Sequence, residues 1–141
     1  MKMRSYSSIE TEFRRHFGEN SNFSWCDFRP KFDGHLINAS LAISPSDSAE
    51  QTYDEAWNAF QEIWIWLGDW ANYFDEGDNI QVVVGFPKYS KPSGQIFKGE
   101  LKVGDLSKLP KNLNLETFAQ CGGHFQELFD WSSYTKTIKK I

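Results

Sequence analysis

The sequence predicts an α+β fold in a single domain spanning residues 1–141, with an antiparallel β-sheet of two hairpins packed against one long central amphipathic helix. Two observations lead to this prediction. Apolar residues between Ser48 and Phe74 recur at the three- and four-residue spacing of one buried helical face. The segments on either side contain alternating or continuous apolar runs typical of strands. The expected order of elements is therefore α-β-β-α-β-β-α.

The long helix is predicted over residues 48–74. Ser48 and Gln51 fit a capping box, in which side chains bond to the free amides of the first helical turn. Gly77 follows at a position where a glycine can take the left-handed conformation that ends a helix. The apolar stripe is centred near Phe60 and Leu67, and we expect four of its side chains to be buried: Phe60, Ile63, Trp64 and Leu67.

Three elements are predicted before the long helix. A short helix at 8–17 carries an apolar side chain at every fourth position: Ile9, Phe13 and Phe17. Alternating residues then predict strands at 23–28 and 36–43. The Asp33-Gly34 pair between these strands favours a tight hairpin turn.

The region after the long helix predicts a second pair of strands. Residues 80–86 are apolar on both faces, as in a central strand, and residues 97–103 alternate like a half-buried one. Residues 115–120 fit one short helical turn. A last helix is expected from residue 124, with apolar side chains at Phe125, Leu128, Phe129 and Ile138 and basic ones at its end at Lys136, Lys139 and Lys140.

The composition indicates a folded cytoplasmic protein. The 16.4 kDa chain is 16% aromatic, which is enough to build a core, and no run approaches the ~18 apolar residues of a membrane span. No apolar segment follows the basic start of the chain, so we expect no signal peptide. Two cysteines, Cys26 and Cys121, do not suggest a secreted disulfide framework, and we expect both to be reduced.

Charge is unevenly distributed along the chain. Residues 46–78 hold nine of the 19 acidic residues and no Lys, Arg or His, a local charge of −9 against +5 for the rest of the chain. On this helix Trp66 and Tyr73 lie off the apolar stripe, and Ile65 lies further still from it. We therefore expect a second, exposed face that binds a partner through Asp54, Glu55, Glu62, Ile65, Trp66, Asp69 and Tyr73.

Aromatic side chains within an acidic field suit binding to a basic protein, because rings supply buried area and charges steer the encounter. In size, charge and aromatic content the chain resembles immunity proteins and antitoxins, which mask basic, nuclease-like toxins. The leading hypothesis is therefore a protein-binding module of this type, with no catalytic residues, cofactor, metal or membrane partner. The same face could also bind a second copy of the chain.

Other functions have weaker support in the sequence. Lys88, Tyr89, Lys91, Lys98 and Lys102 form a mild basic patch on the 88–102 hairpin, which could bind nucleic acid. The net charge of −4 argues only against binding of nucleic acid by the whole surface. An enzyme of unrecognised type is the third reading.

Residues with metal-binding or catalytic chemistry are present without a recognisable motif. Cys121 and His124 have the spacing of half a zinc site or of a nucleophile and base, yet Cys26, His35 and His16 have no matching spacing. The segment 75–78 is too short for a calcium loop. The sequence also leaves open a glycosidase-type site, in which the fold brings together two carboxylates that are distant in sequence.

Overall fold

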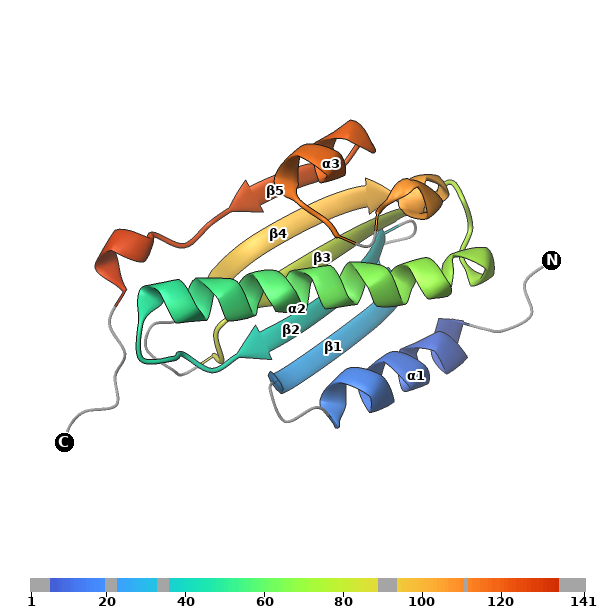
Figure 1. Ribbon diagram of the computed structural model, residues 1–141. Coiled ribbons are helices and arrows are strands. Elements are labelled where there is room, and N and C mark those ends of the chain that lie inside the picture. The colour runs from blue at the N-terminus through green and yellow to red at the C-terminus, as the bar shows by residue number, and fades with distance from the viewer. Residues whose placement is uncertain (1–5, 20–22, 33–35, 89–93, 111, 135–141) are drawn as a thin grey trace.

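A computed structural model describes residues 6–19, 23–32, 36–88, 94–110 and 112–134. They form a five-stranded sheet in the order β1-β2-β3-β4-β5, with one long helix lying across a face of it (Figure 1). This confirms the mixed α+β class. The helices and strands are, in chain order, α1 (Tyr6–Gly18), β1 (Phe23–Phe32), β2 (Leu36–Ile43), α2 (Ala49–Asp69), β3 (Asn79–Gly85), β4 (Gln95–Lys102), α3 (Leu115–Gln120) and β5 (His124–Glu127).

The sheet is mixed, so the prediction of a purely antiparallel sheet is wrong. β1 and β2, β3 and β4, and β4 and β5 pair antiparallel, whereas the central pair β2 and β3 is parallel. The reason is the long helix between them. At 21 residues α2 spans roughly 30 Å, which returns the chain to the end of the sheet where β2 began, and β3 then runs in the same direction.

The long helix begins where the sequence predicts and ends earlier. The Ser48 side chain accepts a hydrogen bond from the Gln51 amide at 3.0 Å, which confirms Ser48 as the N-cap. The α-helix ends at Asp69 instead of residue 74, and a 3-10 turn follows over Ala71–Tyr73. This turn buries Phe74, whose ring lies 6.5 Å from that of Phe28.

The predicted apolar stripe of α2 is confirmed as core. The side chains expected inside have exposed fractions of 2% or less: Phe60, Ile63, Trp64 and Leu67. A glycine in β4 allows this close packing, because a Cβ on Gly99 would lie only 2.5 Å from the Phe60 ring. The sheet and α2 therefore pack in direct contact.

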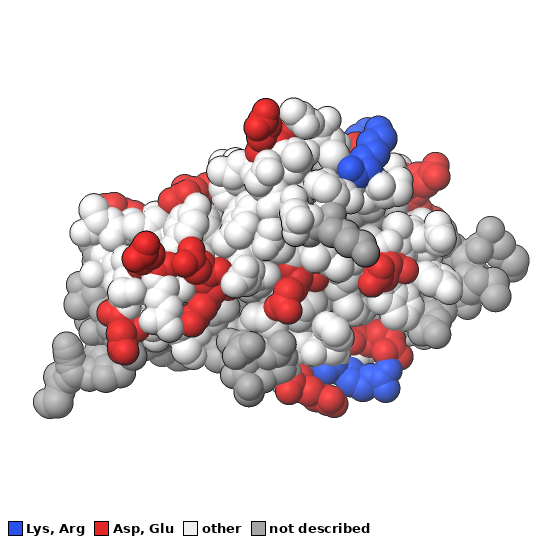
Figure 2. Space-filling view, in the orientation of Figure 1, with Lys and Arg blue, Asp and Glu red and all other residues white. Residues whose placement is uncertain are grey.

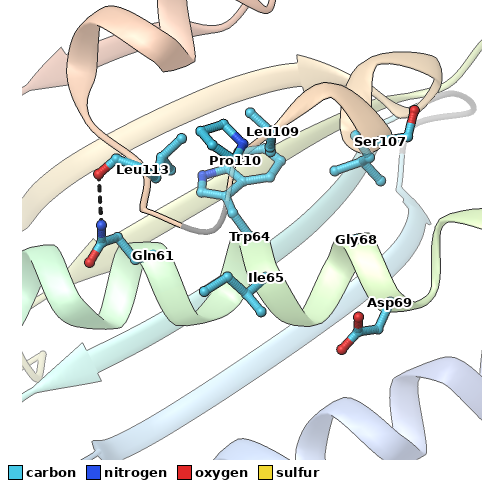
Figure 3. Close-up of a pocket in the computed structure, with 10 residues that line it drawn as sticks. Gln61, Trp64, Ile65, Gly68, Asp69, Ser107, Leu109, Pro110 and Leu113 are labelled. Atoms are coloured by element: carbon cyan, nitrogen blue, oxygen red, sulfur yellow. Dashed lines mark hydrogen bonds between the residues drawn. The ribbon is translucent and has the colours of Figure 1, made fainter.

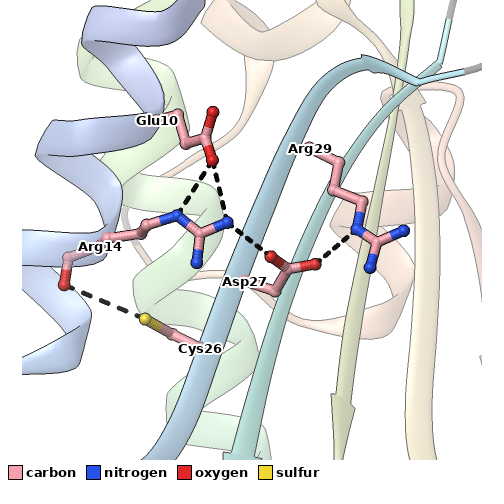
Figure 4. Close-up of polar contacts among 5 residues, drawn as sticks. All are labelled: Glu10, Arg14, Cys26, Asp27 and Arg29. Atoms are coloured by element: carbon pink, nitrogen blue, oxygen red, sulfur yellow. Dashed lines mark hydrogen bonds and ion pairs between the residues drawn. The ribbon is translucent and has the colours of Figure 1, made fainter.

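Helix α1 lies along the edge strand β1, beside α2 (Figure 1). Its predicted stripe is confirmed, since Ile9, Phe13 and Phe17 are all buried. The Arg14 guanidinium joins helix to strand by donating to Glu10 at 2.9 Å and to Asp27 at 2.8 Å, and Arg29 donates to the second oxygen of Asp27 (Figure 4). This network fixes α1 against the edge of the sheet.

The predicted last helix is wrong. The chain turns through Gly122, at φ +92°, and Gly123, where a Cβ would lie 2.4 Å from the Phe118 ring, and then forms β5 alongside β4. The spacing of Phe125, Leu128 and Phe129 misled because a segment this short fits either a helix or a strand. Phe125 turns to the core, whereas Leu128 is 44% exposed.

Several predicted features lie outside the described residues. They are the Asp33-Gly34 turn, His35, residues 89–91 of the basic loop, and Lys136, Ile138, Lys139 and Lys140 of the expected last helix. Within the described part of the chain, no helix combines the length and the apolar character needed to cross a membrane.

Candidate protein-binding surface

The outer surface of α2 is acidic along most of its length. Of the nine acidic residues between 46 and 78, eight are exposed and only Asp78 is buried. Figure 2 shows acidic side chains spread across the front of the molecule, where α2 runs in Figure 1, while the basic groups in this view lie above and below that line. The exposed acids of α2 itself are Glu50, Asp54, Glu55, Glu62 and Asp69.

These carboxylates have no basic partner in the part of the chain that the structure describes. Asp54, Glu55, Glu62 and Asp69 form no ion pair with any residue that the structure describes. Glu55 is held in place by neutral groups, accepting hydrogen bonds from the Ser46 hydroxyl at 2.7 Å and from the Gln51 amide at 3.4 Å. Within the described residues, the negative charge of this surface is therefore uncompensated.

A groove of 490 Å³ follows one side of this acidic surface. It lies between α2 and the segment that leads from β2 into the helix. Three carboxylates and two amides supply polar groups, and Phe23, Ile43 and Pro45 supply apolar wall. We call it the acidic groove, and its polar residues include Asp47, Gln51, Glu55, Asn58 and Glu62.

A smaller hollow of 220 Å³ lies on the other side of α2, against the segment 106–113 (Figure 3). Its walls are mainly apolar. The Gln61 side chain closes one end by donating a hydrogen bond to the Leu113 carbonyl at 2.7 Å. We call this feature the apolar hollow, and it is lined by Gln61, Trp64, Ile65, Gly68, Asp69, Leu106, Ser107, Leu109, Pro110 and Leu113.

The structure changes the predicted partner-binding set at Trp66. This side chain is only 8% exposed, so the prediction of a free ring is wrong. Its ring packs 5.3 Å from Phe13 of α1 and 5.3 Å from Trp70, and Phe17 and Phe28 close the cluster. The reason is α1, whose apolar stripe needs a surface to cover and covers this flank of α2.

The other predicted partner-binding residues keep some exposure. Asp54, Glu55, Glu62 and Asp69 are exposed, and Ile65 is an exposed aliphatic side chain at 46%. Tyr73 is half-buried beside Trp70, at a ring distance of 5.4 Å, and lies on the 3-10 turn rather than on α2. The structure therefore groups the acids with Ile65 and leaves the aromatic pair out.

Sequence reasoning missed the apolar hollow. Leu106, Leu109 and Leu113 belong to a stretch for which the sequence predicts neither a helix nor a strand. Val103–Lys108 forms a 3-10 helix that brings them opposite α2, and no periodic signal marks such a contact between distant segments. The one sequence signal is Gly68, an isolated glycine near the end of a helix.

Among the described residues, no group of three or more Cys, His, Asp or Glu side chains is arranged so that it could hold a metal ion. Cys121 donates to the Lys108 carbonyl at 3.3 Å, and His124 is exposed on β5. Burial raises the pKa of the Cys26 thiol above its ordinary value despite nearby Arg14, so this thiol stays protonated at neutral pH and is a poor nucleophile.

The basic hairpin is only partly described. Lys98 and Lys102 lie on β4 with Glu100 between them, next to His124 and Gln126 of β5. Glu100 interrupts the positive charge on this strand.

Comparison of the chain with protein-family models, with curated proteins and with solved structures found no match to any of them.

Proposed function

We propose that the chain is a binding protein whose outer α2 surface holds a basic protein, most specifically an immunity- or antitoxin-type inhibitor that masks a basic, nuclease-like toxin. It acts by binding, in the cytoplasm, where its two cysteines stay reduced. The observation that carries the proposal is the set of exposed α2 carboxylates without a basic partner in the described chain.

Such a surface is costly for the protein alone. Like charges on neighbouring helical turns repel one another, as at Glu50 and Asp54, and Asp69 places a negative charge at the end of the helix where the dipole favours a positive one. A basic partner removes both penalties when it binds. Charge of this kind speeds association by steering, and it also rejects acidic competitors.

The acidic groove and the apolar hollow give this charged surface two concave regions beside α2. The acidic groove offers carboxylates above an apolar wall, which suits long basic side chains with methylene stems. Ile65 stands between the acids at 46% exposure and gives the surface an apolar centre. A charged rim around an apolar centre is the usual composition of a protein-protein interface.

Affinity purification of the chain from its native source at low and at high salt, followed by mass spectrometry, tests this proposal. We expect a basic protein that elutes with salt and whose nuclease activity falls when the purified chain is added back. An Asp54→Lys/Glu62→Lys variant should lose the protein, and a Glu19→Lys/Glu116→Lys variant should retain it. Recovery of nucleic acid or of an acidic protein, or equal retention by both variants, contradicts the proposal.

A further inference from the structure

The last described residues of the chain reach the start of α2. After β5, residues 128–134 run to the end of the molecule where α2 begins (Figure 1), and we call this segment the strap. There the Tyr134 hydroxyl donates a hydrogen bond to the Ser46 carbonyl and lies 2.8 Å from the Thr52 hydroxyl. Thr52 is fully buried in α2, so the contact ties the strap to the beginning of the helix.

Ser46 connects this contact to the acidic groove. Its amide donates to the Thr52 hydroxyl at 2.9 Å, and its carbonyl accepts from Tyr134. Its own hydroxyl donates to the Glu55 carboxylate at 2.7 Å. Ser46 and Glu55 both line the acidic groove. A shift of the Ser46 backbone would therefore carry its hydroxyl away from Glu55.

Aromatic rings hold the strap against the rest of the molecule. Trp131 packs 5.3 Å from Tyr53 of α2 and stacks on Tyr134 at 6.0 Å. Phe129 lies 5.2 Å from Phe86. The three rings of the strap are only partly buried. Because segments with few fully buried contacts open locally, we expect the strap to leave α2 while the sheet stays folded.

We infer that the strap holds the acidic groove in its binding shape, and that Tyr134 is the positioning residue through which it acts on Glu55. Tyr134 fixes Ser46, and Ser46 in turn fixes the Glu55 carboxylate. When the strap is released, Ser46 moves and Glu55 loses its hydroxyl donor. The role of the groove in holding a basic protein rests on the proposed function, whereas the link from Tyr134 to Glu55 rests on these hydrogen bonds alone.

Tyr134→Phe tests the link, because it removes the hydroxyl and keeps the ring that packs in the strap. We expect the Ser46 amide to exchange with solvent about three- to tenfold faster, as for the loss of one hydrogen bond. The carbon-13 signal of the Glu55 carboxyl group should shift in the same variant. Two groups should not change. They are the Val84 amide in the core of β3 and the Glu62 carboxyl group, which lines the groove without a hydrogen bond to Ser46.

Tyr53→Phe is the matched control. It removes a hydroxyl from the same group of rings, and this hydroxyl makes no hydrogen bond within the part of the chain that the structure describes. Exchange at Ser46 and the Glu55 signal should keep their wild-type values. Equal changes in Tyr53→Phe and Tyr134→Phe, or no change in either, overturn the inference. Faster exchange at Val84 in Tyr134→Phe also overturns it, because the whole fold would then be destabilised.

Ser46→Ala separates the two halves of the link. It removes the hydroxyl that donates to Glu55 and leaves the contact between Tyr134 and the Ser46 backbone. The Glu55 carboxyl signal should shift in this variant alone. Adding Tyr134→Phe should then speed exchange of the amide at position 46 without a further shift at Glu55. A further shift would contradict a link that passes through Ser46.

A last measurement connects the strap to binding. The basic partner, once purified, should bind Tyr134→Phe at least about threefold more weakly than wild type, and Tyr53→Phe as tightly as wild type. Equal binding by Tyr134→Phe and wild type overturns the role of the strap in the binding shape. The exchange and carbon-13 measurements need no partner, so they stand if no basic protein is recovered. Failure of the strap leaves the proposed function in place, because Asp54 and Glu62 form no hydrogen bond with Ser46 or Tyr134.

Discussion

The two flanks of α2 differ in how far they are buried. Toward α1 the flank is closed, with Trp66 buried against Phe13 and the Trp70 ring. Toward the segment 106–113 the flank stays open, with Ile65 46% exposed above a hollow. Trp66 and Ile65 are adjacent in sequence, and both lie off the apolar stripe.

The difference shows that the position of a residue on a helix does not decide its burial alone. Two aromatic side chains of α1, Phe13 and Phe17, pack against Trp66 on one flank of α2. The opposite flank faces a short 3-10 helix, which covers only part of the surface. The closed flank therefore contributes to stability, and the open flank, with the acids beside it, is the one for which we propose a binding role.

The largest effect is expected for Trp66→Ala on the closed flank. Removing this ring leaves a cavity between α1, β1 and α2, and the free energy of unfolding should fall by about 3–5 kcal/mol. Urea denaturation measures the loss. A decrease below about 1 kcal/mol would mean that α1 does not cover this flank, and that Trp66 is the exposed side chain which the helical pattern predicts.

Phe13→Ala tests the same contact from α1. Because the Phe13 and Trp66 rings meet edge to face at 5.3 Å, the two substitutions should not be additive. We expect a coupling free energy of about 0.5–3 kcal/mol in a double-mutant cycle with Trp66→Ala. Additive effects would indicate that α1 and α2 pack independently of each other.

Gly68→Ala on the open flank should act in the opposite direction. It replaces the weaker helix former where a Cβ has free space, so stability should rise by up to about 1 kcal/mol. A stability loss in urea denaturation would show that glycine is required by the fold itself.

The smallest effect on stability is expected for Ile65→Ala. Its side chain is exposed, so the free energy of unfolding should change by no more than about 0.5 kcal/mol. Binding of the proposed basic partner should still weaken, because Ile65 is an exposed apolar side chain among the acids of α2. A loss of stability comparable to that of Trp66→Ala would remove the contrast between the two flanks.

Local sequence patterns predicted much of this fold. Short-range patterns in the sequence predict the apolar stripes of α1 and α2, the Ser48 cap and the positions of four strands. Each of these predictions is confirmed to within a few residues. The parallel pairing of β2 and β3 and the strand β5 are not local properties. They depend on where α2 returns the chain and on the tight turn at Gly123.

The candidate surface was predictable only in part. The one-signed charge of residues 46–78 is plain from the sequence, and all of these nine acids except Asp78 are exposed. The burial of Trp66 depends on which element α1 covers. The apolar hollow depends on a contact between α2 and residues 106–113. Neither contact leaves a periodic trace in the chain.

The most direct test of the central claim is the association rate of the purified basic partner at low and at high salt. Asp54→Lys/Glu62→Lys should slow association at least about tenfold at low salt and flatten its salt dependence, because steering charge is lost. The matched Glu19→Lys/Glu116→Lys variant, with the same change in net charge, should associate at the wild-type rate. Equal slowing by both variants, or none by the α2 variant, would contradict a binding surface on α2.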